Sequence, residues 1–126
     1  MLLKDMAEQL SAATGIDYDP GELLKTDGRI VHLERAYWNR LLVGRMEDKN
    51  PKRFTQEPMP GGPNKGTVFP EDELLPRYYQ VRGWDEETGF PLPETLQEYQ
   101  LDNLMEELEP YRRQYREKVR VGKSCE

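Results

Sequence analysis

The segment at residues 57–66, near the middle of the chain, restricts the fold more than any other feature. It packs three prolines and three glycines into ten residues. Because proline lacks a backbone N–H and fixes φ, neither a helix nor a central strand can run through such a segment. We therefore expect either a linker or a long loop held along a surface, and a loop of this length indicates a specific role.

The residues before this loop show helical periodicity. Apolar side chains in residues 2–14 follow the spacing of one helix face, and Gly15 is placed to end that helix in the left-handed conformation. Asp19 can cap the next helix, with Pro20 in the first turn and Glu22 completing a capping box. Two consecutive helices are therefore predicted before the loop.

The second predicted helix is the longest and extends to about Gly44. Its apolar stripe comprises Leu23, Leu24, Ile30, Val31, Leu33, Tyr37, Trp38, Leu41 and Leu42. Within it, residues 26–28 are a weak stretch because Gly28 costs up to about 1 kcal/mol relative to alanine. This stretch indicates either a close helix crossing or a local kink.

Two further helices are predicted after the loop. One covers Glu71 to Arg82, with acidic residues at its N-terminal end and Gly83 as its stop. Pro76 interrupts the pattern, so the firm helix is expected to start there and the earlier turn to bend. Residues 84–91 suggest a compact turn, and a short helix is expected over residues 93–100.

The C-terminal tail, residues 102–126, begins acidic and ends basic, which suits a helix dipole. Pro110 leaves open whether the tail forms one helix or two. No segment shows a convincing strand pattern. The predicted fold class is all-α: a small helical domain with a long Pro/Gly-rich irregular loop and a charged C-terminal helix.

The composition excludes several classes of protein. The net charge of −6 argues against a nucleic-acid binder, whose basic surface supplies most of the affinity. One cysteine and one histidine cannot form an internal disulfide, a four-ligand iron–sulfur site or a multi-histidine metal site. No apolar stretch approaches the ~18 residues of a membrane span, and the N-terminus lacks a signal-peptide pattern. We expect a soluble, cytoplasmic, single-domain protein.

No residue pattern predicts catalytic residues, a metal site or a cofactor site in this chain. His32 lies in the long helix and is expected to pack or face solvent, and Cys125 is expected to be an inert, exposed thiol. The acidic clusters at residues 71–73 and 85–87 suit a helix N-terminus or a solvated surface. Residues 61–66 lack the pattern of a phosphate-binding loop.

Short strings follow one another in a fixed order between Ala7 and Leu101. They are Leu10–Gly15, Asp17-Tyr18, Glu22–Leu24, Gly28–Ile30, Leu33–Ala36, Arg53-Phe54, Glu57-Pro58, Gly62-Pro63, Lys65-Gly66, Tyr78-Tyr79, Arg82–Asp85 and Gly89–Pro91. Each string alone is weak, but their order and spacing together are specific. They resemble the C-terminal helical region of the tungstopterin-dependent aldehyde ferredoxin oxidoreductase family.

The resemblance implies an enzyme that oxidises aldehydes to carboxylic acids and passes electrons to ferredoxin. Members hold tungsten or molybdenum on a bis-pterin beside a 4Fe-4S cluster, and the cluster cysteines and most pterin-binding motifs lie upstream of this region. Residues 1–101 are then expected to be a C-terminal domain, with residues 102–126 as a charged tail extension. The chain is expected to be a fragment, or else a separately encoded small subunit, that is inactive alone and scaffolds the cofactor domains.

The resemblance also suggests site residues. Family members commonly show Asn-x-Arg-x-Gly where this chain has Trp38–Leu42, so only Arg40 matches and the aldehyde specificity is open. Arg40, Arg45 and Lys65 are the candidates for a position beside the channel above the metal. The alternative for each is a surface charge that holds the loop.

A second interpretation is a stand-alone helical interaction module, or a small subunit, that dimerises or docks through its charged tail. Under the first interpretation the partners are the remaining oxidoreductase domains and, through the whole enzyme, ferredoxin. A fragment is expected to expose an apolar patch where its partner domains pack. A module is expected to be monodisperse and to fold cooperatively, and an independent enzyme would turn over a substrate alone.

Overall fold

The computed structural model describes residues 2–123, and this part of the chain is helical. The helices are α1 (Leu3–Thr14), α2 (Pro20–Arg40), α3 (Lys52–Gln56), α4 (Glu71–Arg82), α5 (Pro93–Glu98) and α6 (Asn103–Lys123). Within these residues the β-structure is confined to one isolated antiparallel bridge, between Trp84 and Pro91. The all-α prediction is confirmed.

The predicted capping signals set the start of α2 and the end of α1. The Asp19 carboxylate accepts hydrogen bonds from the backbone N–H groups of Gly21 (2.6 Å) and Glu22 (2.9 Å). The Glu22 carboxylate in turn accepts from the Asp19 N–H at 3.4 Å, which completes the capping box. Gly15 ends α1 with φ of 73°, in the left-handed region.

The prediction that the second helix extends to about Gly44 is wrong, because α2 ends at Arg40. Leu42 has φ of 56°, which turns the backbone off the helix axis. The Asn39 side-chain amide donates to the Val43 carbonyl at 3.0 Å and stabilises this turn. Gly44 does not end the helix but lies in close contact with the backbone of Thr88. A Cβ at Gly44 would lie 2.4 Å from the Thr88 carbonyl oxygen.

Gly28 allows a close approach inside an unbroken helix. A Cβ at this position would lie 2.4 Å from Cε1 of Tyr99, at the C-terminal end of α5. Of the two interpretations of residues 26–28, the close approach is therefore the correct one, with the Tyr99 ring as the packing partner. Helices α4 and α6 also continue through their prolines, Pro76 and Pro110.

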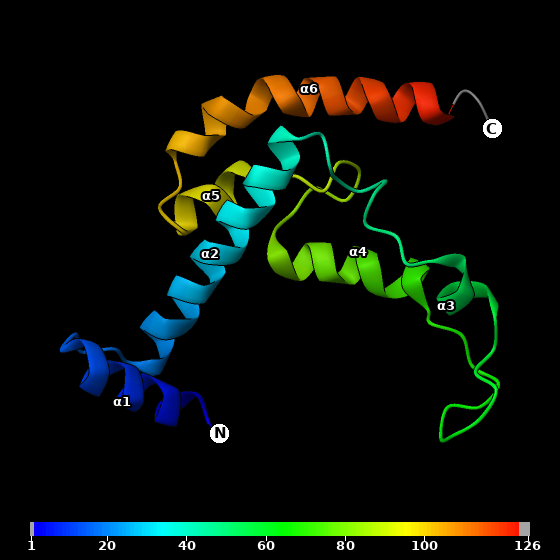
Figure 1. Ribbon diagram of the computed structural model, residues 1–126. Coiled ribbons are helices and arrows are strands. Elements are labelled where there is room, and N and C mark those ends of the chain that lie inside the picture. Colours follow the sequence, from blue (N-terminus) through cyan, green and yellow to red (C-terminus); the bar gives the residue numbers. More distant parts are fainter. Residues whose placement is uncertain (1, 124–126) are drawn as a thin grey trace.

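The core lies where α2, α5 and α6 meet. Helix α6 lies across the ends of α2 and α5, and α1 packs near the N-terminal half of α2 (Figure 1). The core cluster consists of Ala36, Phe90, Leu96, Leu101, Leu104, Leu108, Tyr115 and Val119. Four of these eight side chains belong to α6, so the charged tail helix is an integral part of the core.

Helix α3 and the Pro/Gly-rich segment lie away from this core. Figure 1 shows them extending beyond the start of α4, on the opposite side of the molecule from α1 and α5. Helix α3 has no buried residue and no apolar periodicity, which is why the sequence did not predict it. Among the described helices, none is long and apolar enough to cross a membrane.

Candidate functional site

Arg35 is the centre of a buried polar network. Its guanidinium donates to both carboxylate oxygens of Asp48, from Nη1 at 3.0 Å and from Nη2 at 2.5 Å. Nε donates to the Gly89 carbonyl at 2.7 Å, and the guanidinium lies 4.6 Å from the centre of the Trp84 ring. This one side chain therefore joins α2 to the segment after it and to the turn before α5.

Tyr79 of α4 completes this network. Its hydroxyl donates to Asp48 Oδ2, and Arg35 Nη2 lies 3.3 Å from the same hydroxyl oxygen. Burial, followed by the hydrogen bond to Asp48, raises the pKa of Tyr79 well above its ordinary value. Tyr79 therefore stays protonated at neutral pH, and the network is a charged structural joint with no acid or base poised for proton transfer.

His32 is a packing residue, the first of the two roles, packing or solvent exposure, that the sequence analysis left open for it. It is buried, and its Nδ1 accepts a hydrogen bond from Trp84 Nε1 at 3.0 Å. Its ring centre lies 4.4 Å from that of Tyr99. Burial, followed by the positive charge of Arg82, lowers the pKa of His32, so the ring is neutral at pH 7.

A second polar network connects α6 to the segment after α2. Glu47 Oε2 accepts from the Tyr115 hydroxyl and from the Gly44 N–H, both at 2.8 Å. Lys118 donates to Glu47 Oε1 at 2.5 Å and to the Leu42 carbonyl at 3.1 Å. Burial alone would raise the pKa of Glu47, but the hydrogen bonds from Lys118, Gly44 and Tyr115 outweigh it and lower that pKa.

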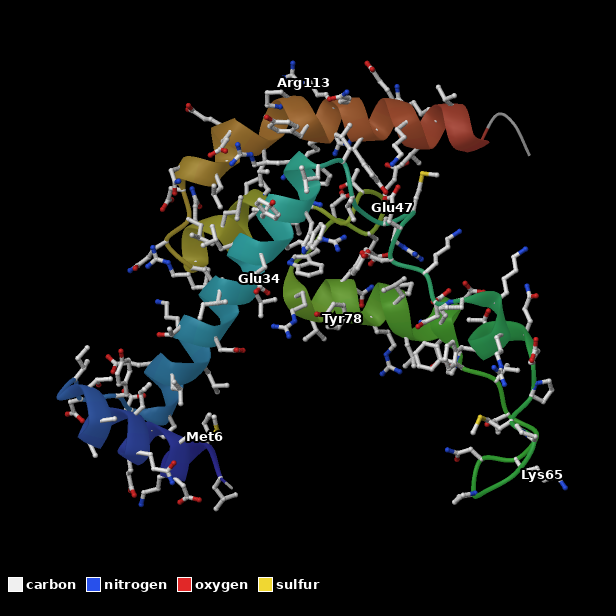
Figure 2. All side chains as sticks on the ribbon, viewed as in Figure 1. Met6, Glu34, Glu47, Lys65, Tyr78 and Arg113 are labelled. Atoms are coloured by element: carbon white, nitrogen blue, oxygen red, sulfur yellow. The ribbon has the colours of Figure 1, made fainter. Side chains whose placement is uncertain are left out.

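The structure does not gather Arg40, Arg45 and Lys65 into one site. Arg40 is half-exposed and pairs with Glu107 of α6 at 3.0 Å. Arg45 is partly buried, with its guanidinium 5.7 Å from the centre of the Tyr79 ring. Figure 2 shows Lys65 at the far end of the loop between α3 and α4, well away from Glu47.

The two acidic clusters have local structural roles. Glu71 accepts from the backbone N–H of Asn50 at 2.6 Å and from its side-chain amide at 2.8 Å. These hydrogen bonds, the backbone one first, lower the pKa of Glu71. Asp85 Oδ1 accepts from the N–H and the hydroxyl of Thr88, both at 2.7 Å, and so fixes the turn before α5.

In the described part of the chain, the side chains that could bind a metal do not come together into a metal centre. No group of three or more His, Cys, Asp or Glu side chains there could hold a metal ion. Cys125 lies outside the described residues. The described residues thus offer no such ligand cluster for a metal ion or an iron–sulfur site.

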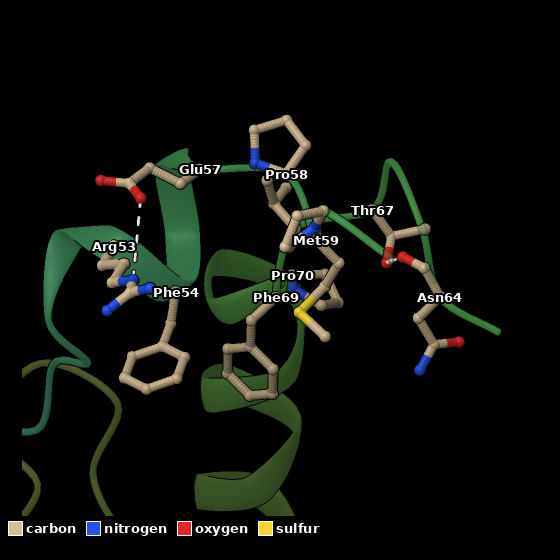
Figure 3. Close-up of a pocket in the computed structure, with 11 residues that line it drawn as sticks. Arg53, Phe54, Glu57, Pro58, Met59, Asn64, Thr67, Phe69 and Pro70 are labelled. Atoms are coloured by element: carbon tan, nitrogen blue, oxygen red, sulfur yellow. Dashed lines mark hydrogen bonds and ion pairs between the residues drawn. The ribbon is translucent and has the colours of Figure 1, made fainter. Parts of the chain in front are cut away.

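An open apolar groove lies along α3 and the loop that follows it. The groove encloses about 790 Å³, and the side chains of Phe54, Met59 and Phe69 lie along it (Figure 3). These three side chains are between 45% and 59% exposed. Arg53 and Glu57 lie at its rim, 3.7 Å apart.

Helix α2 presents its apolar stripe outward. The side chains that it buries are instead mostly small or polar: Gly28, His32, Arg35, Ala36 and Asn39. Five large apolar side chains of the helix are each between 50% and 59% exposed: Leu24, Ile30, Leu33, Tyr37 and Trp38. An exposed apolar surface of this kind is what the sequence analysis expected of a fragment.

Sequence reasoning missed the Arg35–Asp48 joint. The partners are 13 residues apart, and Asp48 lies outside any regular element. The one available signal was the placement of Arg35 between Leu33 and Ala36, where a long charged side chain interrupts an apolar pattern. Such a position implies a buried partner, but it does not say which carboxylate supplies it.

Comparison with known proteins identifies the family. Residues 1–101 match the family model for aldehyde ferredoxin oxidoreductase, domains 2 & 3. The tungsten-containing aldehyde ferredoxin oxidoreductase of Pyrococcus horikoshii is 43% identical over 102 residues, which are 80% of this chain and 17% of that protein. The enzyme of the same name from Thermococcus kodakarensis is 43% identical over 88 residues, which are 69% of this chain and 14% of that protein.

These matches cover less than one fifth of the relatives' length and leave α6 outside the family model. The matched residues include the whole of α1–α5 and both apolar surfaces described above. The resemblance seen in the sequence is thereby confirmed, and the chain belongs to the aldehyde ferredoxin oxidoreductase family.

Proposed function

We propose that this chain is a helical domain of a larger oxidoreductase that oxidises aldehydes to carboxylic acids and passes the electrons to ferredoxin. Its role is to scaffold the domains that hold the cofactors and to close the channel above the metal. On its own it has no activity. The observation that carries the proposal is the outward apolar stripe of α2, in a chain that matches less than one fifth of its relatives' length.

The stripe is hard to explain in a free-standing domain. Burying one large apolar side chain contributes about 1.5–3 kcal/mol. The stripe leaves five such side chains half-exposed on one helix, while polar side chains occupy its inner face. Contiguous apolar patches of this kind mark surfaces that pack against another protein or domain.

The cofactors belong to the rest of the enzyme under this proposal. The relatives are named as tungsten-containing, and the described residues of this chain form no cluster of metal-binding side chains. We therefore assign the tungsten or molybdenum bis-pterin and the 4Fe-4S cluster to the other domains. The whole enzyme is proposed to be cytoplasmic.

Arg40, Arg45 and Lys65 remain candidates for the channel side. Arg45 has the best support, because Tyr79 and the backbone bond from Arg45 N–H to the Thr88 carbonyl (3.0 Å) hold it in a fixed place. Arg40 is engaged by Glu107. Lys65 is exposed at a loop tip and can meet only a neighbouring domain.

The second interpretation, dimerisation through the charged tail, has less support. The inner face of α6 is buried in the chain's own core. Two of its charged side chains, Glu107 and Lys118, pair with Arg40 and Glu47 of the same chain. The tail charges are thus already partly engaged within one copy.

The test is complementation by two separate polypeptides. The Pyrococcus horikoshii oxidoreductase would be produced without its matched 102-residue segment, and this chain would be supplied separately. We expect the two to form a stable complex and to recover aldehyde oxidation, measured with an artificial electron acceptor, whereas each alone is inactive. Turnover by this chain alone, or elution as a dimer with no complex, would contradict the proposal.

A matched pair of variants shows whether the stripe makes the contact. Tyr37→Arg places a charge in the stripe and is expected to weaken the complex at least tenfold. Val121→Arg makes a similar change at an exposed position on α6, outside the family match, and is expected to have less than a twofold effect. Equal effects of the two variants would exclude the stripe as the interface.

A further inference from the structure

Residues 49–70, which we call the arm, form an ordered projection. The Met59 N–H donates to the Thr67 carbonyl, and the Gly66 N–H donates to the Met59 carbonyl, both at 2.9 Å. At the base of the arm, the Phe69 N–H donates to the Phe54 carbonyl at 2.9 Å. Figure 1 shows the arm extending away from the α2–α5–α6 core. The arm therefore has a shape of its own, which its own backbone bonds fix.

The apolar side chains of the arm do not contribute to the core. None of the buried core residues in the described chain comes from residues 49–70. Phe54, Met59 and Phe69 instead lie along the open groove, with prolines as part of its wall (Figure 3). Since these side chains stabilise little in this chain, the groove is shaped to receive an apolar group from elsewhere.

The charge of the arm is opposite to that of the chain. The whole chain carries −6, but the arm has four basic residues, Lys49, Lys52, Arg53 and Lys65, against one acidic residue, Glu57. Lys65 lies at its tip (Figure 2). An apolar groove on an arm with an excess of basic residues suits a segment that presents an apolar side chain beside carboxylates.

We infer that the arm is a docking element whose groove takes an apolar, acid-flanked segment from the remaining polypeptide of the oxidoreductase. The arm lies wholly within the family-matched residues, so it belongs to the part shared with relatives whose chains extend mostly beyond the match. This inference rests on the proposed function, because it takes the occupant from the same larger enzyme. It adds a second contact surface, separate from the α2 stripe.

Site-specific photo-cross-linking tests which partner fills the groove. A photoreactive p-benzoylphenylalanine would replace Met59 in this chain, in complex with the Pyrococcus horikoshii protein that lacks its matched segment. A matched control carries the same group in place of Arg113, an exposed residue on α6. We expect the Met59 position to cross-link to one peptide of the oxidoreductase that contains an apolar residue beside carboxylates, with a yield at least five times that of the control.

Two other cross-linking results would overturn the inference. A cross-link from the Met59 position to a second copy of this chain would make the arm a self-association element. A yield equal to that of the Arg113 position would mean that the groove is open in the complex.

Charge reversal tests the excess positive charge of the arm. The double variant Lys52→Glu/Lys65→Glu is expected to weaken the complex about tenfold at low salt, with a smaller effect at 0.5 M salt because the ions screen exposed charges. The control Lys4→Glu/Lys25→Glu reverses two lysines on α1 and α2 and is expected to change the affinity less than twofold. Equal losses in the two double variants would contradict a specific role of the positive charge of the arm.

The two proposals fail in different ways. If the wild-type chain forms no complex, both the proposed function and the docking role of the arm are overturned. If a complex forms and Tyr37→Arg weakens it, but the arm neither cross-links nor responds to charge reversal, only the inference about the arm fails.

Discussion

Arg35 and Asp48 form a bidentate salt bridge that joins the last third of α2 to the segment leading into the arm. The Arg35 side chain is only 9% exposed, so its charge depends on this partner. Removing one member of a buried pair leaves the other uncompensated, which typically costs about 3–5 kcal/mol.

We therefore expect Arg35→Met to lower the free energy of unfolding by roughly 3 kcal/mol. Urea denaturation followed by circular dichroism would measure the change. The control is Arg113→Met, which removes an exposed i,i+4 pair with Glu109 and is expected to cost less than about 0.5 kcal/mol. A loss below about 1 kcal/mol for Arg35→Met would show that the pair is not structural.

His32 should make the domain sensitive to mild acid. Its pKa is lowered in the folded state, by burial first, so the unfolded state binds more protons as the pH falls below the ordinary value of 6.5. Stability is then fully present above that pH and is lost on acidification. In His32→Gln, which keeps an acceptor for Trp84, we expect a flatter stability profile between about pH 7 and pH 5.

Measurement of unfolding free energy at several pH values would show this difference. Equal slopes for the wild type and the variant across that window would mean that His32 protonates freely in the folded state, against its burial beside Trp84 and Tyr99.

Three helix boundaries, the end of α1, the start of α2 and the end of α4, followed from local sequence, but the end of α2 and the face that it buries did not. The capping box of Asp19 and Glu22, and the left-handed glycines Gly15 and Gly83, act within a few residues, so the sequence predicts them directly. The inward face of α2 depends on Asp48 and Tyr99, which come from other elements. Helical periodicity alone would turn the apolar stripe of α2 toward the core. That assignment fails because the sequence does not reveal that Arg35, on the other face, has a buried partner.

The candidate site shows the same limit. A lone histidine on a helix was expected to pack or to face solvent, since chemistry would have needed partners that the sequence lacks, and the structure selects packing. The positions of Arg40, Arg45 and Lys65 depend on where α2 ends and on how the arm projects, and both are set by non-local contacts. The turn at Leu42, for example, is held by Lys118 of α6.

Protonation of Glu47 should cause a second loss of folding stability, at a lower pH than the loss caused by His32. Its pKa is lowered in the folded state, so its contribution is present above the ordinary value of 4.5 and is lost as the pH falls through the lower folded value. We expect Glu47→Gln to reduce stability at pH 7 and to remove part of the acid sensitivity below about pH 4.5. Chemical denaturation at pH 7 and pH 3.5 would test it, with Glu8→Gln, an exposed change on α1, as the control.

Gly28 should resist a substitution that normally stabilises a helix. In an open helix Gly→Ala gains up to about 1 kcal/mol. Here the added Cβ would lie 2.4 Å from the Tyr99 ring, and overpacking of this kind typically costs about 1–3 kcal/mol. Gly28→Ala is therefore expected to lower the melting temperature, and Tyr99→Leu in the same chain is expected to restore part of it. A rise in melting temperature for Gly28→Ala alone would show that the Tyr99 ring does not pack against Gly28.

Helix α6 lies beyond the family match, yet the core depends on it. Leu108 is fully buried against the cluster that includes Phe90 and Leu96. Truncation of such a side chain costs about 2–5 kcal/mol, a large share of the about 5–15 kcal/mol by which domains are stable. We expect Leu108→Ala to lower the unfolding free energy by that amount and Val121→Ala, 66% exposed on the same helix, to change it by less than about 0.5 kcal/mol.

The same reasoning predicts the result of removing α6 altogether. A chain that ends at residue 102 would expose Ala36, Phe90 and Leu96, and we expect it to lose cooperative unfolding in calorimetry. If that shorter chain melted cooperatively at an unchanged temperature, α6 would be an appendage, and residues 1–101 would form the folding unit alone. A loss of the transition, together with the Leu108→Ala result, would show that the core of residues 1–101 depends on α6.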